Sequence, residues 1–142
     1  MFTIKICGIT SAADARLAVD AGADAIGINF YAASPRFVPP EQALHIAAAA
    51  TGVVRVGVFV NADAETVCGV FDGVSLDAIQ LHGDEPPEFL TQLGRRPVMR
   101  AFLVGADGLR LVREYLNECR ALGVLPRAVL LDAHVPGEFG GT

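Results

Sequence analysis

The chain has 142 residues, of which 52% are hydrophobic and 19% charged, and this length and composition suit one compact domain with its own core. Its formal net charge of -5 at pH 7 argues against nucleic-acid binding, because phosphate recognition needs a basic surface. No apolar run reaches the roughly 18 residues that a membrane span requires, and the first residues lack a signal-peptide pattern. We therefore expect a cytoplasmic protein that does not act at membranes.

Strand and helix patterns alternate along the whole chain. Strands are predicted over residues 2–7, 24–30, 53–60, 77–81, 97–104 and 127–132. Five segments with apolar residues at helical spacing lie between them, and a glycine-rich tail occupies residues 135–142. This alternation predicts a single α/β domain over residues 1–142, with parallel strands joined by right-handed crossovers.

The first strand ends in a pattern that is typical of a functional site. Side chains alternate along a strand, so Lys5 and Cys7 share one face while Ile4 and Ile6 share the other. A glycine follows the thiol at once, and Thr10 or Ser11 can cap the next helix. Cys68 and Cys119 differ from Cys7, because they fall in helical patterns typical of buried cysteine.

The cysteines and histidines are dispersed along the sequence. Three cysteines without a CxxC pair predict no disulfide framework. Three scattered histidines do not give the ligand spacing of a zinc site. We therefore expect neither structural disulfides nor a metal.

Two architectures fit an alternating α/β pattern, a closed (βα)8 barrel and an open doubly wound sheet. The open sheet suits the length better, but the turn after the first strand lacks its GxGxxG loop. If the more aliphatic face of each strand packs on helices, the other face carries these polar residues: Lys5, Cys7, Asn29, Gln80, His82, Arg100 and Asp132. A barrel would gather strand ends around one mouth, which favours the barrel. For Asn29 and Arg100, a role as capping or satisfied core groups stays open.

The length conflicts with a complete barrel. Six strand-helix units by residue 132 mean that eight would need on the order of 180 residues or more. We therefore expect only about the first six βα units, an incomplete barrel from which two strands are missing. Two open apolar edges would make such a chain prone to aggregation.

Several stretches resemble one enzyme family, and they occur in the family's order over the whole chain. They are Lys5-Ile6-Cys7-Gly8-Ile9-Thr10, Ser34-Pro35-Arg36-Phe37-Val38, Val56-Gly57-Val58-Phe59-Val60-Asn61, Ile79-Gln80-Leu81-His82-Gly83-Asp84-Glu85, and Leu130-Leu131-Asp132 with Gly137 to Thr142. The chain resembles the phosphoribosylanthranilate isomerases, (βα)8 barrels of tryptophan biosynthesis. The family continues through two more strands, whose loops hold the substrate phosphate.

The resemblance implies an isomerase that converts N-(5-phosphoribosyl)anthranilate to 1-(2-carboxyphenylamino)-1-deoxyribulose 5-phosphate by an Amadori rearrangement. It assigns the general base to Cys7 and the general acid to Asp132, and it places Arg36 on the anthranilate carboxylate. A nearby Lys5 ammonium would favour the Cys7 thiolate, and an enclosed site would keep Asp132 protonated.

The resemblance also bears on the surroundings of these groups. Lys5, Gln80 and His82 would line the same mouth, to contact substrate or to hold the structure. Gly137, Gly140 and Gly141 suggest a lid that excludes water. No cofactor or metal is implied, the partner is the small-molecule substrate, and the protein would be a monomer or homodimer.

Two other interpretations stay open at the level of the sequence. The chain could be a truncated, non-catalytic fragment of such a barrel. It could also be a different phosphosugar-binding α/β protein, such as an epimerase or indole-glycerol-phosphate synthase, although the pair of Cys7 and Asp132 does not favour these.

Overall fold

The computed structural model describes residues 2–105 and 108–133, and it contains one parallel sheet. Its strands are β1 (Lys5–Cys7), β2 (Ala25–Asn29), β3 (Val54–Phe59), β4 (Ala78–Leu81), β5 (Val98–Val104) and β6 (Ala128–Ala133). They lie in the order β1-β2-β3-β4-β5-β6, so each strand pairs with its neighbour in the sequence. All six predicted strands are confirmed, with shifts of a few residues at their ends.

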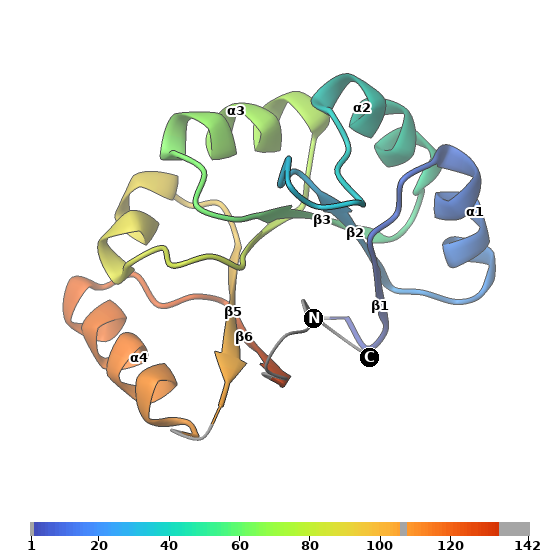
Figure 1. The fold of residues 1–142 in the computed structure, drawn as a ribbon. Helices are drawn as coiled ribbons and strands as arrows, with labels where there is room; N and C mark the ends of the chain where they lie inside the picture. The colour runs from blue at the N-terminus through green and yellow to red at the C-terminus, as the bar shows by residue number, and fades with distance from the viewer. Residues whose placement is uncertain (1, 106–107, 134–142) are drawn as a thin grey trace.

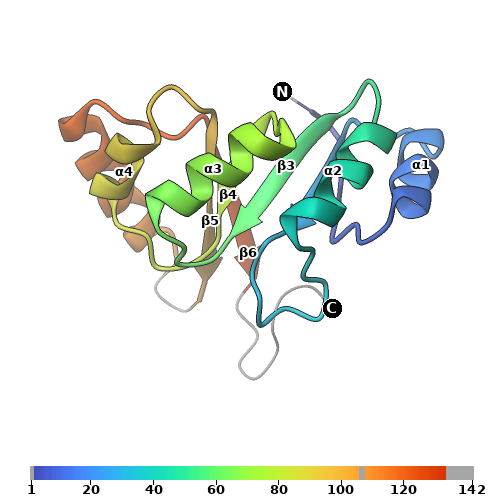
Figure 2. The same ribbon diagram turned by 90° about the horizontal axis from the view of Figure 1, so that it is seen from above.

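The helices all lie on the convex face of the sheet, as Figures 1 and 2 show. They are α1 (Ala12–Asp20), α2 (Pro40–Ala49), α3 (Ala64–Val74), the short 3₁₀ helix η1 (Pro87–Leu93) and α4 (Arg110–Leu122). A doubly wound sheet would carry helices on both faces, whereas this sheet curls like part of a barrel. The barrel interpretation is therefore confirmed for a curled arc of six strands. None of the described helices is long and apolar enough to cross a bilayer.

Local signals in the sequence explain where the helices begin. Ser11 caps α1, because its hydroxyl accepts a hydrogen bond from the Asp14 amide at 3.0 Å. Asp63 caps α3 by accepting from the Thr66 amide at 2.7 Å. Pro40 opens α2 at a position where a missing amide hydrogen costs nothing.

The main core fills the space between the sheet and its helices. Its largest fully buried side chains include Phe59, Ile26, Ile28, Ile79 and Leu81. A second, smaller cluster lies on the concave face and consists of Ala25, Val56, Ala78 and Met99. Both faces of the strands thus bury apolar side chains, as parallel sheets require.

Arg100 lies on the opposite face of the sheet from the one we predicted. The register pairs Gln80 with Met99 and Leu81 with Arg100, so Arg100 faces the helices with Leu81. Its guanidinium lies over the rings of Phe102 and Tyr115. The structure therefore supports the core role that the sequence left open: Arg100 is only 5% exposed and its Nη atoms are hydrogen-bonded, although its Nε has no partner among the described residues.

Candidate active site

The thiol of Cys7, at the end of β1, lies against Gly27 of β2. Cys7 is paired with Gly27 in the register, and its side chain is exposed on the concave side. A Cβ atom at Gly27 would lie only 2.6 Å from the Cys7 sulfur. The glycine therefore makes room for the thiol, a requirement that the sequence analysis did not identify.

Arg36 folds over the turn that follows Cys7. Gly8 adopts a φ of +81°, and a Cβ atom there would lie 2.6 Å from Arg36 Cδ and 2.7 Å from Nη1. The absence of a side chain at Gly8 thus lets the guanidinium approach the end of β1. This places Arg36 beside the candidate base, although the two are 29 positions apart in the sequence.

The loop that carries Arg36 is braced by Asn29 and Ser34. The Ser34 hydroxyl accepts hydrogen bonds from Asn29 Nδ2 at 3.2 Å and from the Arg36 amide at 3.1 Å. Asn29 Oδ1 accepts in turn from the Tyr31 amide at 2.8 Å. Asn29 therefore has the capping role that the sequence left open, and Ser34 positions Arg36.

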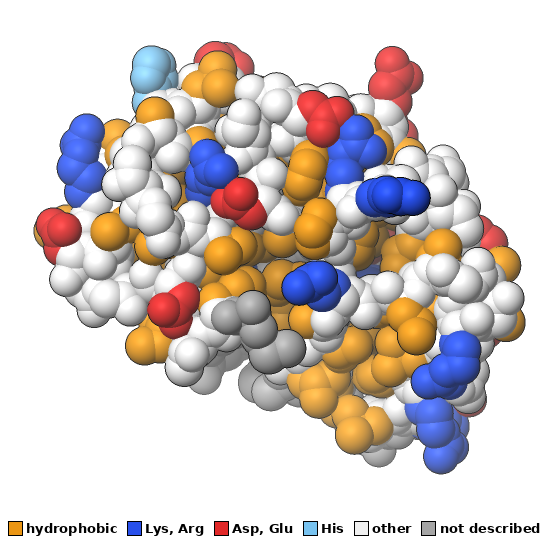
Figure 3. All heavy atoms as spheres, turned by 180° about the vertical axis from the view of Figure 1, so that it is seen from behind, with side chains coloured by type: hydrophobic (Ala, Val, Ile, Leu, Met, Phe, Trp, Pro, Cys, Tyr) orange, Lys and Arg blue, Asp and Glu red, His pale blue; other side chains and the backbone are white. Residues whose placement is uncertain are grey.

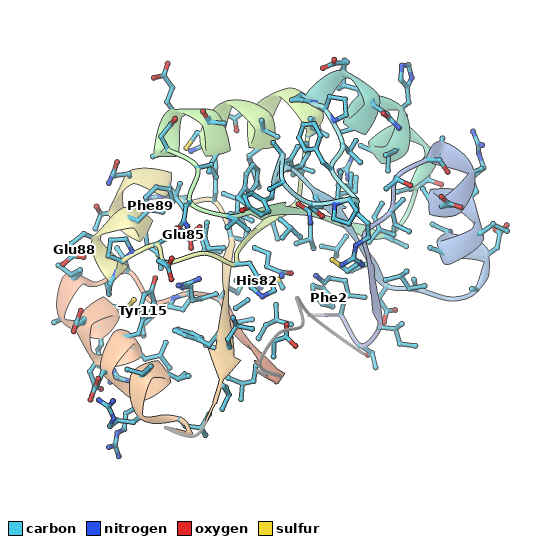
Figure 4. The ribbon with its side chains drawn as sticks, in the orientation of Figure 1. Phe2, His82, Glu85, Glu88, Phe89 and Tyr115 are labelled. Carbon is cyan, nitrogen blue, oxygen red and sulfur yellow. The ribbon has the colours of Figure 1, made fainter. Side chains whose placement is uncertain are left out.

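Four of the predicted site residues form a connected line across the concave face. Lys5 Nζ donates to Gln80 Oε1 at 2.5 Å, and Gln80 Nε2 lies 3.4 Å from His82 Nδ1. His82 Nε2 lies 3.7 Å from Asp132 Oδ2. The line joins β1, the end of β4 and β6, and Figure 4 shows His82 extending into the interior of the arc.

Burial lowers the pKa of His82 below its usual value, because desolvation disfavours the imidazolium. The positive charges of Lys5 and Arg100 lower this pKa further. The negative charges of Asp132 and Glu85 act in the opposite direction and raise it. A neutral imidazole is therefore the resting form at neutral pH.

A buried ion pair supports the loop after β4 from the helix side of the sheet. Glu85 and Arg100 are joined at 3.1 Å, and their side chains are 3% and 6% exposed. Arg100 also donates to the carbonyls of Leu81 at 3.1 Å and Gly83 at 2.8 Å. Figure 4 shows Glu85 on the outer side of this loop, away from His82.

The same carboxylate also ties this loop to the one after β3. Glu85 accepts from the amides of Asn61 at 2.8 Å and Gly83 at 3.0 Å. Asn61, held at a φ of 53°, accepts in turn from the Asp84 amide at 2.7 Å. In the sequence Glu85 is part of a motif without an assigned role. Its partner, Arg100, follows fifteen residues later, on the face of β5 that packs against the helices.

The described residues thus bring Cys7 and Arg36 together at one end of the site, and Gln80, His82 and Asp132 at the other, with Lys5 between them. Gly137, Gly140 and Gly141, the predicted lid, lie outside the described residues. Among residues 2–105 and 108–133 there is no group of three or more potential metal ligands.

These features define a class of protein: a parallel βα-barrel-type protein whose polar groups gather on the concave face, most of them at or near the carboxyl ends of the strands. Residues 4–139 match the family described as "N-(5'phosphoribosyl)anthranilate (PRA) isomerase". The chain belongs to this family.

Named relatives and solved structures agree with this assignment. The N-(5'-phosphoribosyl)anthranilate isomerase of Citrifermentans bemidjiense is 44% identical, covering 100% of this chain and 65% of its own length. That of Azotobacter vinelandii is 46% identical, covering 97% and 64%. The crystal structure of the Thermotoga maritima enzyme superposes with a TM-score of 0.82 at 41% identity, covering 100% of this chain and 66% of that one.

A further structure holds a ligand. It is a phosphoribosyl anthranilate isomerase in complex with reduced 1-(o-carboxyphenylamino)-1-deoxyribulose 5-phosphate, with a TM-score of 0.80 at 40% identity and coverage of 94% of this chain and 66% of that one. This chain therefore spans about two thirds of the length of the relatives it matches.

Proposed function

We propose that this chain forms the larger part of an isomerase that carries out the Amadori rearrangement of N-(5-phosphoribosyl)anthranilate in tryptophan biosynthesis. The observation that carries the proposal is the placement of Cys7, Arg36 and Asp132 around one concave surface, on a fold shared with that family. Cys7 is the general base, Asp132 the general acid and Arg36 the anchor of the anthranilate carboxylate.

The reaction needs an acid first and a base second. Asp132 gives its proton to the ring oxygen of the ribose, and the bond between this oxygen and C1 breaks with its electron pair on the oxygen. The lone pair of the anilino nitrogen then forms the C=N bond of a Schiff base. The Cys7 thiolate removes the C2 proton, and the resulting enol becomes the ketone by gaining a proton at C1 and losing one from O2.

Cys7 and Asp132 lie on the same concave face, among other polar groups. Lys5 stands two residues before Cys7 on that face. Asp132 has 30% of its side chain exposed and lies 3.7 Å from His82 Nε2. The two groups come from strands at opposite ends of the sheet, so a sugar bound between them is flanked from two sides.

The proposal also includes how the barrel is closed and where the substrate phosphate binds. Two further βα units would pair with β6 and β1, complete a (βα)8 barrel and supply the loops that hold the phosphate. Support comes from the coverage of the relatives and from the sheet itself, in which β1 pairs with β2 alone and β6 with β5 alone among the described residues. Gly137, Gly140 and Gly141 would form a lid over this mouth.

The proposal is tested by turnover of the aromatic aldosylamine, followed by fluorescence, with the chain extended by two βα units of the family. We expect isomerisation, and its loss in Asp132→Asn, since the amide cannot protonate the ring oxygen. Asp84→Asn, on an exposed loop residue, is the matched control and should retain turnover. An Asp132→Asn variant as fast as the parent would overturn the assignment of the acid.

A further inference from the structure

Along the line from Lys5 to Asp132, each polar atom can act in only one way, as a hydrogen-bond donor or as an acceptor. A lysine ammonium can only donate hydrogen bonds, so the Gln80 atom that faces it at 2.5 Å must be the oxygen. The other end of the Gln80 amide is then the NH₂ group, which can only donate, and it faces His82 Nδ1 at 3.4 Å. Gln80 is buried, so its amide has little access to water as an alternative partner.

A donor at Nδ1 settles which nitrogen of His82 carries the proton. A neutral imidazole has one N–H and one acceptor, so accepting at Nδ1 leaves the hydrogen on Nε2. Nε2 is the atom that faces Asp132 Oδ2, at 3.7 Å. Burial lowers the pKa of His82, and the charges of Lys5 and Arg100 lower it further. The charges of Asp132 and Glu85 raise it, but the net shift is downwards. The ring therefore presents a single N–H to the candidate acid.

We propose that Gln80, oriented by Lys5, is a positioning residue that holds His82 in the Nε2–H tautomer, and that this N–H stabilises the Asp132 carboxylate formed when the acid gives up its proton. The catalytic consequence rests on the proposed isomerase function, whereas the tautomer is a property of the resting protein. The same geometry explains why a buried amide lies among groups that carry charge.

The line acts on a defined step. Before ring opening Asp132 is a carboxylic acid, and its proton can point to the substrate. When this proton has moved to the ring oxygen, with the electron pair of the C1–O bond staying on that oxygen, Asp132 becomes a carboxylate. The Nε2–H of His82, 3.7 Å from Asp132 Oδ2, interacts more strongly with this carboxylate than with the neutral acid, so it favours the product side of the transfer.

The tautomer is measured directly by ¹⁵N NMR of the histidine side chains in the chain extended by two βα units, with His82 assigned from a His82→Asn variant. We expect a protonated Nε2 and an unprotonated Nδ1 at neutral pH. In Gln80→Glu a carboxylate replaces the amide and can only accept, so the proton should move from Nε2 to Nδ1. His45→Asn, on an exposed position of α2, is the control and should leave the His82 signals unchanged.

Kinetics test the consequence in the chain extended by two βα units. Gln80→Glu should lower kcat roughly ten- to hundredfold, the effect of losing one N–H donor that faces a developing charge, with KM little changed. Lys5→Met gives a second route, since without the ammonium the Gln80 amide is free to turn, and both tautomers should appear in the spectrum.

A wild-type ring with its proton on Nδ1, or a Gln80→Glu spectrum identical to wild type, would overturn the inference. So would a shifted tautomer with unchanged kcat, because His82 would then not assist Asp132. An extended chain with the expected tautomer but no isomerase activity would instead count against the proposed function.

Discussion

At the scale of single residues, the site depends on two glycines without side chains as much as on its reactive groups. The Cys7 thiol fits because residue 27 is glycine, and Arg36 reaches the same place because residue 8 is glycine. The thiol itself is exposed, so it contributes little to the packing of the core. Activity and stability should therefore separate at Cys7.

We expect Cys7→Ala to lower turnover by about 10²- to 10⁴-fold, the usual contribution of a general base, with a change in unfolding free energy within about 0.5 kcal/mol. Fluorescence-detected turnover and urea unfolding measure the two quantities. Cys68→Ala, in α3, is the control and should keep full activity. A Cys7→Ala variant with near wild-type turnover would remove this residue from the mechanism.

Arg36→Ala should act mainly on substrate binding, because the anthranilate carboxylate lies away from the bonds that change. The lost charge-assisted contact should cost roughly 1.5–3 kcal/mol and appear as a higher KM. Arg36→Lys keeps the charge without the planar fork and should recover only part of the loss. If KM stayed constant while kcat collapsed, Arg36 would belong to the chemistry itself.

Alternation along the strands predicted the concave positions of Lys5, Cys7, Gln80 and Asp132 because one face of these strands is clearly more aliphatic than the other. On β5 both faces are apolar, with Val98, Phe102 and Val104 on one and Met99, Ala101 and Leu103 on the other. Because the apolar pattern on β5 does not distinguish its two faces, we assigned Arg100 to the concave face from its charge alone. The register places it on the helix-facing side instead. Its true partner, Glu85, could not be identified, because a buried ion pair leaves no periodic trace in the sequence.

At the scale of elements, the strands and the loops that follow them hold the site in two different ways. The Cys7 side chain on β1 requires a glycine beside it on β2, whereas the loops after β3 and β4 are tied by one buried carboxylate. Helix starts, strand limits and the parallel order followed from caps and periodicity. The contacts between loops did not, since they join residues that only the folded sheet brings together.

We expect Gly27→Ala to displace the Cys7 thiol, because the added Cβ would lie 2.6 Å from its sulfur. We expect turnover to fall and the rate of Cys7 alkylation to change. Gly69→Ala, in α3, adds a methyl group where no atom lies within 4 Å. This control should keep turnover and gain roughly 0.5–1 kcal/mol in unfolding free energy. A fully active Gly27→Ala variant would show that the thiol position is not critical.

The loop anchor predicts a large loss of stability in Glu85→Gln, because it leaves the Arg100 guanidinium buried without its counter-charge. Breaking such a pair costs roughly 3–5 kcal/mol, which urea unfolding can measure. Glu118→Gln, exposed on α4, should change the unfolding free energy by no more than about 0.5 kcal/mol. Equal stability of the two variants would mean that the pair does not anchor the loops.

At the scale of the whole molecule, the ends of the curled sheet expose apolar surface. Ile4, just before β1, is 53% exposed, and Leu131 on the outer face of β6 is 55% exposed. Leu122 and Leu125, at the end of α4 and just beyond it, are also exposed. Seen from behind, hydrophobic side chains gather in the hollow of the arc and towards its α4 end (Figure 3). Among the described residues, β1 and β6 each pair with one strand only, and an open strand edge beside such surface promotes association.

We therefore predict that the 142-residue chain on its own is inactive and either aggregated or domain-swapped, while the chain extended by two βα units is active. The short chain contains Cys7, Arg36 and Asp132, but a phosphosugar held at one end loses the remote binding energy that orients it for proton transfer. Size-exclusion chromatography and the turnover assay, run on both proteins, measure the two outcomes together. A monomeric and active 142-residue chain would contradict both parts, because it would show that six strands suffice to bind the phosphate and to protect the open edges.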